Sequence, residues 1–419
     1  MAAGVRMALP IIRSTVVTTY RSLFAGPAFR WFWTGFTVSA LGDAMSQVAL
    51  VWMVFDRTRS VETLGLFSVA YTAPVIVGGL AAGWILDRVD RRLVMLIDSL
   101  FRGLVVGTVP VLAAIGRLEV WHLFAVAVVY GLLKMVTLAG GPSIVPVIVP
   151  ERALDAANSL ETLGWTISGV AGPAIAGLMI PSIGAANVLA LDALSYFVFA
   201  LALAKLPGMP ADAASSAMTG TGYSAAFRLV VRSPALLITT LMFMAFNVGQ
   251  GLSFVWLPVL VREVFRTGAE TYGFLLGALA AGEVVGSLWA GSSRIQLSTG
   301  VRIAAAQVLS GLALGLVVVT ASAPGAGAAL FAFGAFSAPL TIWAQSLRMR
   351  VIPPALRGRT FALLRTLMQG AAPVGGGLAG AVLPVIGIPL TIVASAAAIA
   401  LPGAAGLLAR GLRDADSRR

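Results

Sequence analysis

Long apolar segments separated by short charged loops repeat along this chain. Segments 64–86 and 93–115, for example, are joined by only six residues, five of them charged. About 20 consecutive apolar residues suffice to span a bilayer as a helix, and helices satisfy their own backbone in lipid. The chain is 58% hydrophobic and 11% charged, more apolar than a soluble fold could bury. The pattern therefore predicts a polytopic, all-helical membrane protein.

Twelve such segments can be marked in the 419 residues. They cover 29–55, 64–86, 93–115, 121–149, 153–180, 183–206, 235–261, 272–292, 301–321, 325–347, 360–383 and 389–408. Residues 207–223 shift to Pro, Gly, Ala, Ser, Thr and Asp, as in a linker. We therefore expect an N-terminal segment over 1–27, six helices over 28–206, a linker over 207–223, six helices over 224–409 and a tail over 410–419.

The two halves also share residues at nearly the same offset. Pro27 aligns with Pro234 and Gly42 with Gly249, and later blocks pair Gly83 with Gly291. This correspondence indicates duplication of a six-span unit, an arrangement found in transporters built from parallel repeats.

Basic residues are distributed unevenly between the two ends of these segments. Of the 29 Lys and Arg residues, most lie in loops on the side of residues 87–92. Five lie on the other side (Arg57, Arg59, Arg117, Arg262, Arg266) and three within spans (Arg102, Lys134, Arg365). The positive-inside rule then places both termini in the cytoplasm, with residues 1–27 on the inner leaflet. The net charge of +12 reflects this topology and not a nucleic-acid partner.

Several kinds of chemistry are excluded by composition. The chain has no cysteine, so thiol nucleophiles, disulfides and iron–sulfur clusters are absent. Its single histidine, His122, cannot form a histidine metal site or a credible serine triad. Neither Lys134 nor Lys205 belongs to a phosphate-binding loop. We expect no metal, no cofactor and no enzymatic activity, so energy for transport must come from a gradient.

The charged loop after the second segment carries an ordered motif. Its residues are Gly83, Leu86, Asp87, Arg88, Arg91 and Arg92. This order resembles the loop between the second and third spans of major facilitator superfamily transporters, which implies twelve helices in two six-helix bundles. In that family the Asp docks on the start of the eleventh span, where the helix dipole favours a carboxylate. We therefore expect a cytoplasmic gate formed by Gly83, Asp87, Arg88, Arg91, Arg92, Arg357 and Arg359.

Finer similarity points to one branch of this superfamily. Residues 39–43, 156–160, 191–195 and 354–359 resemble the twelve-span drug:proton antiporters that include macrolide and siderophore exporters. Gly169, Gly172, Pro173 and Gly177 resemble the Gly-Pro motif of antiporters, although Ser168 replaces a usual Gly. The resemblance implies a kinked hinge and export. The Arg motif that better-known drug antiporters carry in span 4 is missing here. Their proton relay therefore cannot be assigned to this chain.

Ionisable groups inside the spans are the candidates for the transport path, because each is costly in lipid unless paired or hydrated. Asp43 lies in the middle of span 1, which lines the central cavity in this superfamily. It could bind and release a proton, or serve as a packing or gate contact. Gln250 occupies the corresponding position in the second half.

Three further side chains remain open to two interpretations. Glu161 and Glu283 lie in spans 5 and 8, where a protonation switch or an ion pair between the halves would fit. For Glu161, a polar group that faces water fits equally well. For Glu283, a functional role is the preferred interpretation. Lys134 could attract anionic substrates, but a counter-charge to a nearby carboxylate is the preferred interpretation. Asp192, and the i,i+4 pair of Asp98 and Arg102, are interpreted as structural.

Large apolar side chains could line a cavity for hydrophobic substrates. The candidates are Trp52, Phe246, Phe254, Trp256, Trp343, Met45 and Met244, each of which could instead pack or face lipid.

These observations predict a secondary exporter in the plasma membrane of a bacterium. It would exchange protons for small amphipathic compounds such as drugs by alternating access, as a monomer in the lipid bilayer. An importer or facilitator of a nutrient on the same fold is the alternative. A non-transporting receptor is a third interpretation, but the chain offers no large soluble domain for it.

Overall fold

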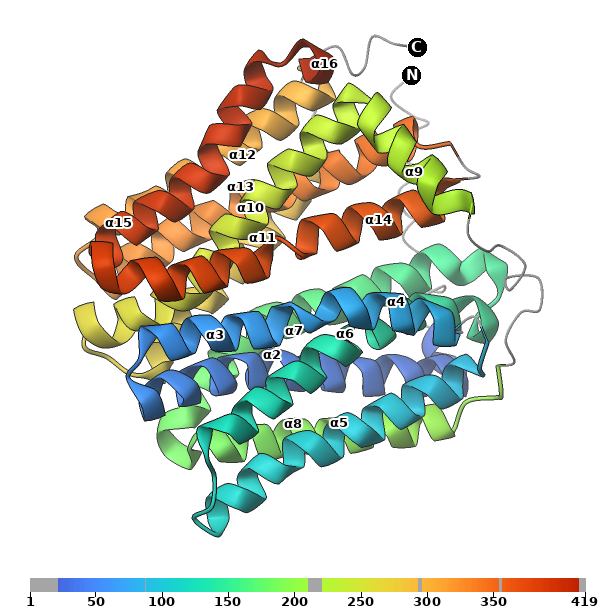
Figure 1. Ribbon diagram of the computed structural model, residues 1–419. Coiled ribbons are helices and arrows are strands. Elements are labelled where there is room, and N and C mark those ends of the chain that lie inside the picture. Colours follow the sequence, from blue (N-terminus) through green and yellow to red (C-terminus); the bar gives the residue numbers. More distant parts are fainter. Residues whose placement is uncertain (1–21, 87, 210–220, 293–295, 354–355, 414–419) are drawn as a thin grey trace, which may run out of the picture.

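The computed structural model describes residues 22–86, 88–209, 221–292, 296–353 and 356–413. Within these ranges the regular structure is entirely helical (Figure 1). The first half contains α2 (Pro27–Thr58), α3 (Val61–Thr72), α4 (Pro74–Leu86), α5 (Arg91–Ala114), α6 (Val120–Ile148), the short η1 (Glu151–Ala153), α7 (Leu154–Ile183) and α8 (Ala185–Ala204). The second half contains α9 (Thr221–Arg232), α10 (Pro234–Val259), η3 (Leu260–Val264), α11 (Ala269–Ser292), α12 (Thr299–Gly315), η4 (Leu316–Val319), α13 (Ala323–Val351), α14 (Arg357–Gln369), α15 (Ala372–Leu408) and α16 (Arg410–Arg413).

Eleven helical stretches in the described chain are long and apolar enough to cross a membrane. The last runs for 50 residues from Arg359 to Leu408 and contains a non-helical residue, Gly387, with a φ of 76°. It therefore holds both the eleventh and the twelfth predicted spans. The predicted fold class, two six-helix bundles of membrane-spanning helices, is confirmed.

Two spans are interrupted where the sequence analysis predicts continuous segments. The second span breaks at Ala73, directly before Pro74, whose missing N–H cannot continue the helix. The eleventh breaks between Gln369 and Ala372, so that α14 and α15 share it. An additional helix, α9, precedes the seventh span. The predicted membrane-surface segment lies mostly outside the described residues, and so does most of the linker.

The repeat seen in the sequence is preserved in the backbone. Pro27 and Pro234 begin α2 and α10, the first spans of the two halves. Beyond the far end of each of these spans an arginine has a left-handed backbone, Arg59 with a φ of 51° and Arg266 with a φ of 54°. Such conformations are uncommon for residues other than glycine, so their recurrence at matching positions supports duplication.

The two halves lie one above the other in Figure 1, with α3 packed on α15 and α7 packed on α11. We call the end of the molecule where α8 ends and α9 begins the linker side, and the end carrying Arg59 and Arg266 the far side. The start of α2 and the end of α16 also lie at the linker side (Figure 1).

Glycines bring the halves into close contact near the far side. A Cβ atom at Gly65 of α3 would lie 2.5 Å from the Gly380 Cα atom of α15. A Cβ atom at Gly273 of α11 would lie 2.7 Å from the Gly177 Cα atom of α7. Small residues allow helix backbones to approach in this way within a membrane. The far side of the molecule is therefore sealed by backbone-to-backbone packing between the halves.

This packing predicts that Gly273→Val destabilises the protein. The added side chain would overlap the α7 backbone, and overpacking of this kind typically costs about 1–3 kcal/mol. Gly291→Val, on the same helix, is the control, because a Cβ atom there would meet nothing within 4 Å. Thermal unfolding of the purified protein should show a lower melting temperature for Gly273→Val only. Equal melting temperatures for the two variants would contradict the close contact.

Candidate functional site

A cavity of about 760 Å³ lies between the two halves. Helix α7 of the first half and α10, α11 and α13 of the second half form its walls. Its lining residues are Ser159, Thr162, Leu163, Thr166, Gly169, Val170, Phe243, Phe246, Asn247, Gln250, Ala280, Glu283, Val284, Ser287, Leu288, Ser337, Ala338, Thr341 and Ile342. Pockets for drug-sized ligands occupy about 300–1,000 Å³, so this cavity has the size of a ligand site.

The cavity lies in the half of the molecule nearer the linker side. On α7 it extends from Ser159, close to the start of the helix, to Val170 near the middle, and on α11 it extends from Ala280 to Leu288, close to the end. Beyond its inner end the halves are in contact, with the rings of Trp52 and Tyr272 stacked 6.3 Å apart. The large cavity thus lies on the linker side of this contact, and the halves are in contact at the far side.

A polar contact between the halves lies at the far side. Arg262, in the π-helical turn after α10, lies 3.4 Å from a carboxylate oxygen of Asp56 on α2. Its guanidinium group also lies 5.9 Å from the centroid of the Trp52 ring. The Arg262 and Asp56 side chains are 35% and 46% exposed, so this pair contributes little energy compared with the glycine contacts.

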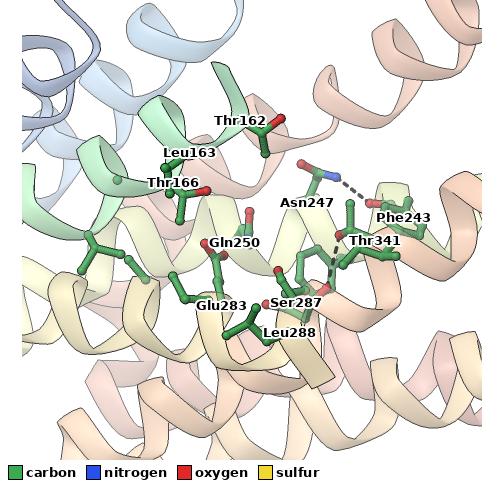
Figure 2. A pocket seen from close by; sticks show the side chains of 18 of the residues that line it. Thr162, Leu163, Thr166, Phe243, Asn247, Gln250, Glu283, Ser287, Leu288 and Thr341 are labelled. Atoms are coloured by element: carbon green, nitrogen blue, oxygen red, sulfur yellow. Dashed lines mark hydrogen bonds between the residues drawn. The ribbon is translucent and has the colours of Figure 1, made fainter. Parts of the chain in front are cut away.

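The chemistry of the large cavity is mixed. Figure 2 shows Glu283, Gln250 and Ser287 directed into the same space as Thr162 and Thr166 of α7. Among the described lining residues, Glu283 is the only one with an ionisable side chain. Its carboxylate makes no hydrogen bond or ion pair with any described residue.

Other polar groups of the cavity are already partly engaged by their own helices. The Asn247 amide donates to the Phe243 carbonyl at 2.8 Å, and the Thr341 hydroxyl donates to the Ser337 carbonyl at 3.2 Å (Figure 2). Leu163, Phe246 and Leu288 add apolar surface. The site therefore combines apolar walls, neutral polar groups and one unpaired carboxylate.

A smaller cavity of about 160 Å³ lies inside the first half. It is lined by Ala40, Asp43, Ala44, Gln47, Tyr71, Arg102, Tyr130, Lys134, Thr137, Trp165, Ser168 and Gly169. Gly169 lines both cavities, so the two spaces border each other at this residue.

Arg102 is the centre of a buried charge network beside the smaller cavity. It is only 1% exposed and lies 3.2 Å from a carboxylate oxygen of Asp98, one helical turn earlier on α5. It also lies 3.9 Å from a carboxylate oxygen of Asp43 on α2. Its guanidinium group donates to the Leu133 carbonyl at 2.5 Å and to the Tyr196 hydroxyl at 3.3 Å. The Tyr196 hydroxyl in turn donates to Asp43.

Asp192 on α8 forms a second buried carboxylate site beside this network. It is fully buried and accepts hydrogen bonds from Ser46 at 2.5 Å and from Ser195 at 3.1 Å, and a further one from Tyr130. No Lys or Arg of the described chain lies within ion-pair distance of it. The rings of Tyr130 and Tyr196 are 6.3 Å apart, so two neighbouring tyrosines connect Asp192 with Asp43.

The remaining predicted path residues occupy different surroundings. Lys134 lines the smaller cavity with Asp43, and it lies within electrostatic range of the cationic Arg365 of α14. Gln250 lines the large cavity. Glu161 lines neither cavity; it is 7% exposed, lies against Gly141 of α6 and has no hydrogen bond or ion pair with described residues.

The predicted gate is only partly described. Arg88, which follows α4, folds back over the Trp84 ring of that helix, with a distance of 4.6 Å to the centroid. Arg91 donates to the Ser143 carbonyl at 3.5 Å, whereas Arg92 donates to the last carbonyls of α8. These contacts join the linker-side ends of α5, α6 and α8. Gly83 lies in α4, which contacts α14, the helix that carries Arg359. Asp87 and the side chain of Arg357 lie outside the described residues.

The glycines of the antiporter-like motif have three different surroundings. A Cβ atom at Gly172 would lie 2.5 Å from the Ala44 Cβ atom of α2. Gly177 contacts α11 of the other half, as does the carbonyl of Pro173. Gly169, in contrast, faces open space with nothing within 4 Å of its Cβ position.

Of the seven large apolar side chains that could line a cavity or pack, Phe246 lines the large cavity and the other six do not. Trp256 is fully buried and donates to the Ser395 hydroxyl at 2.9 Å within the second half. Phe254 stacks on Tyr71 at 5.9 Å, and Trp343 packs on Trp289 at 5.7 Å. Met45 and Met244 also lie outside the lining. These side chains instead pack between helices, which a uniformly apolar span does not reveal.

Functional candidates that sequence reasoning missed are polar groups on apolar helices. They are Tyr130 and Tyr196, together with Thr162, Thr166, Asn247 and Ser287 of the large cavity. The structure also joins Arg102 to Asp43, although the sequence analysis interprets Arg102 as structural. The i,i+4 spacing of Asp98 and Arg102 was the available signal, but it does not indicate a partner on another helix.

Comparison with known proteins supports a transporter. A family model described as transmembrane secretion effector, of the major facilitator type, matches residues 18–418. The multidrug efflux pump Tap of Mycolicibacterium fortuitum is 26% identical over 403 residues, covering 93% of this chain and 97% of that protein. Macrolide efflux protein A of Streptococcus pyogenes is 24% identical and covers 83% of this chain and 87% of that protein.

Solved structures show the same fold at low identity. The nucleoside transporter NupG superposes with a TM-score of 0.73 and 12% identity, covering 90% of this chain and 99% of that chain. A POT family transporter in complex with 5-aminolevulinic acid gives a TM-score of 0.70 and 13% identity, covering 91% of this chain and 95% of that chain.

The charge network predicts that Arg102→Leu is strongly destabilising. Removing one partner of a buried ion pair costs about 3–5 kcal/mol, because the remaining carboxylates stay unpaired. Adding Asp98→Asn to this variant should recover part of the loss, since it removes one of those carboxylates. Arg88→Leu is the control, because the Arg88 side chain is exposed and donates a hydrogen bond to the Trp84 carbonyl of the preceding helix. A melting temperature of Arg102→Leu equal to that of Arg88→Leu would contradict the assigned role.

Proposed function

The chain belongs to the transmembrane secretion effector family of the major facilitator superfamily, and from this membership we propose that it exports small amphipathic compounds in exchange for protons. It is a membrane transporter and not an enzyme. The efflux functions named for its relatives belong to those proteins, but they favour export over import as the direction here.

The large cavity is the observation that carries this proposal. Its volume of about 760 Å³ suits a drug-sized molecule, and its apolar and polar walls suit an amphipathic one. The excess of Lys and Arg on the linker side supports a cytoplasmic location for that side in a bacterial cell. The described state then faces inward, ready to take substrate from the cytoplasm or the inner leaflet.

Charge balance supports a proton site in the first half. The buried part of the network contains two carboxylates, of Asp98 and Asp192, but only one cation, Arg102, which the half-buried Asp43 shares. Lys134 and Arg365 lie nearby but are exposed. An unpaired charge in the membrane interior is costly, and a proton bound to one of these carboxylates would reduce that cost. Asp43 is the best carrier, because it lines a cavity whereas Asp98 and Asp192 are 6% and 0% exposed.

Alternating access follows from the two different ends of the molecule. Outward release requires the far side to open, which means separating Gly65 from Gly380 and Gly177 from Gly273. The Pro173 region of α7 lies at this contact and would act as the hinge. The basic residues that follow α4, with those at the start of α14, would lock the cytoplasmic side after it closes.

The test is extrusion of a preloaded cationic dye and of a macrolide from cells that express the chain. We expect energy-dependent extrusion that stops when a protonophore collapses the proton gradient. Asp43→Asn should reduce extrusion to the level of cells lacking the protein, because an amide cannot carry the proton. The control is Glu151→Gln, since Glu151 is an exposed carboxylate away from both cavities.

Two results would contradict this proposal. Extrusion that persists without a proton gradient would exclude proton coupling, and full activity of Asp43→Asn would exclude Asp43 as the proton carrier. Failure to extrude any compound of a broad panel would favour an importer or a facilitator.

A further inference from the structure

We propose that the substrate and the proton bind in separate cavities: an organic cation binds in the large cavity against Glu283, and the proton binds at Asp43 in the small one. This inference rests on the proposed function and adds to it a substrate class and the side chain that recognises the substrate charge.

Size separates the two sites. The cavity at Asp43 measures about 160 Å³, below the roughly 300 Å³ at which pockets for drug-sized molecules begin. It has room for a few water molecules, each of which occupies about 30 Å³ in the liquid. The cavity at Glu283 is several times larger, at about 760 Å³. A drug-sized substrate therefore fits beside Glu283 and does not fit beside Asp43.

The charges around the two cavities also favour an organic cation beside Glu283 and not beside Asp43. Asp43 already has a guanidinium group 3.9 Å away and accepts a hydrogen bond from Tyr196, and Lys134 lines the same cavity. These two cations would repel an organic cation. Glu283 has no such neighbour, and its carboxylate is unpaired among the described residues. A bound cation would remove the cost of leaving that charge unpaired inside a membrane.

The walls around Glu283 suit a cation with a large apolar body. Phe246 and Val284 offer apolar surface, while Gln250, Thr166 and Ser287 offer neutral hydrogen-bonding groups from two directions (Figure 2). Among the described lining residues no Lys or Arg competes for the carboxylate. This composition favours a monovalent organic cation over an anion or a sugar.

The border at Gly169 explains how the two sites would influence each other. Thr166 and Val170 line the large cavity, Trp165 and Ser168 line the small one, and Gly169 lines both. A Cβ atom at Gly169 would meet nothing within 4 Å, so little side-chain material separates the sites there. Charges interact strongly in such surroundings of low dielectric constant. A cation at Glu283 would favour release of the proton from Asp43, and by reciprocity a proton at Asp43 would weaken cation binding, as antiport requires.

The experiment measures binding to the purified full-length chain in lipid nanodiscs. The probes are tetraphenylphosphonium, a permanent cation, and triphenylphosphine oxide, a neutral molecule of related shape. Glu283→Gln should weaken tetraphenylphosphonium binding at least tenfold, equivalent to about 1.4 kcal/mol, and leave the neutral probe unchanged. Glu151→Gln, the same carboxylate-to-amide change at an exposed residue away from both cavities, should keep the affinity for tetraphenylphosphonium within about threefold, or about 0.65 kcal/mol.

The outcomes distinguish this inference from the proposed function. Unchanged tetraphenylphosphonium binding in Glu283→Gln, or an equal loss in Glu151→Gln, would overturn the separate cation site even if the wild type extrudes macrolides. If Glu283→Gln weakens the binding of both probes, binding to Glu283→Asp is measured as well. Recovery of tetraphenylphosphonium binding in Glu283→Asp would support the cation site, and no recovery would overturn it. If tetraphenylphosphonium binding depends on Glu283 but cells show no proton-driven extrusion, the cation site is supported and the proposed export function is overturned.

Discussion

The membrane interior offers no water to pair with polar groups, and the rest of this structure depends on that constraint. It forces the backbone into helices, since only they satisfy their own N–H and C=O groups in lipid. It also forces buried charges to find partners within the protein. Arg102 is the clearest consequence, because it gathers Asp98, Asp43 and Tyr196 from three different helices. The network holds the first bundle together and places a titratable carboxylate beside a cavity.

The two halves share a backbone plan but divide the chemistry between them. The first half holds the charge network, whereas the position that corresponds to Asp43 in the second half is Gln250, a residue of the large cavity. Glu283 gives the second half its own carboxylate, on a helix of the cavity wall. Duplication provides two bundles that can rock against each other. Divergence of their polar residues would then allow one bundle to sense protons and the other to contact substrate.

Glycine contacts and cavities alternate along the contact between the bundles. Near the far side, Gly65, Gly177, Gly273 and Gly380 let backbones touch, which closes that end of the path. Towards the linker side the same helices diverge and leave the large cavity. Gly169 belongs to the antiporter-like stretch, yet it borders two cavities and packs against nothing. A single helix, α7, thus connects the closed end, the border between the sites and the wall of the substrate cavity.

The sequence alone determined the helical class, the twelve spans, the duplication and the set of polar residues inside the spans, because segment length and hydropathy are local properties. It could not determine which face of each span points inward, since a helix that is apolar all round carries no periodic signal of burial. Only the tertiary structure showed that Glu283 faces a cavity while Glu161 does not, and that Trp256 packs within one bundle. The link from Arg102 to Asp43 and the role of Tyr130 and Tyr196 likewise required contacts between residues far apart in the chain.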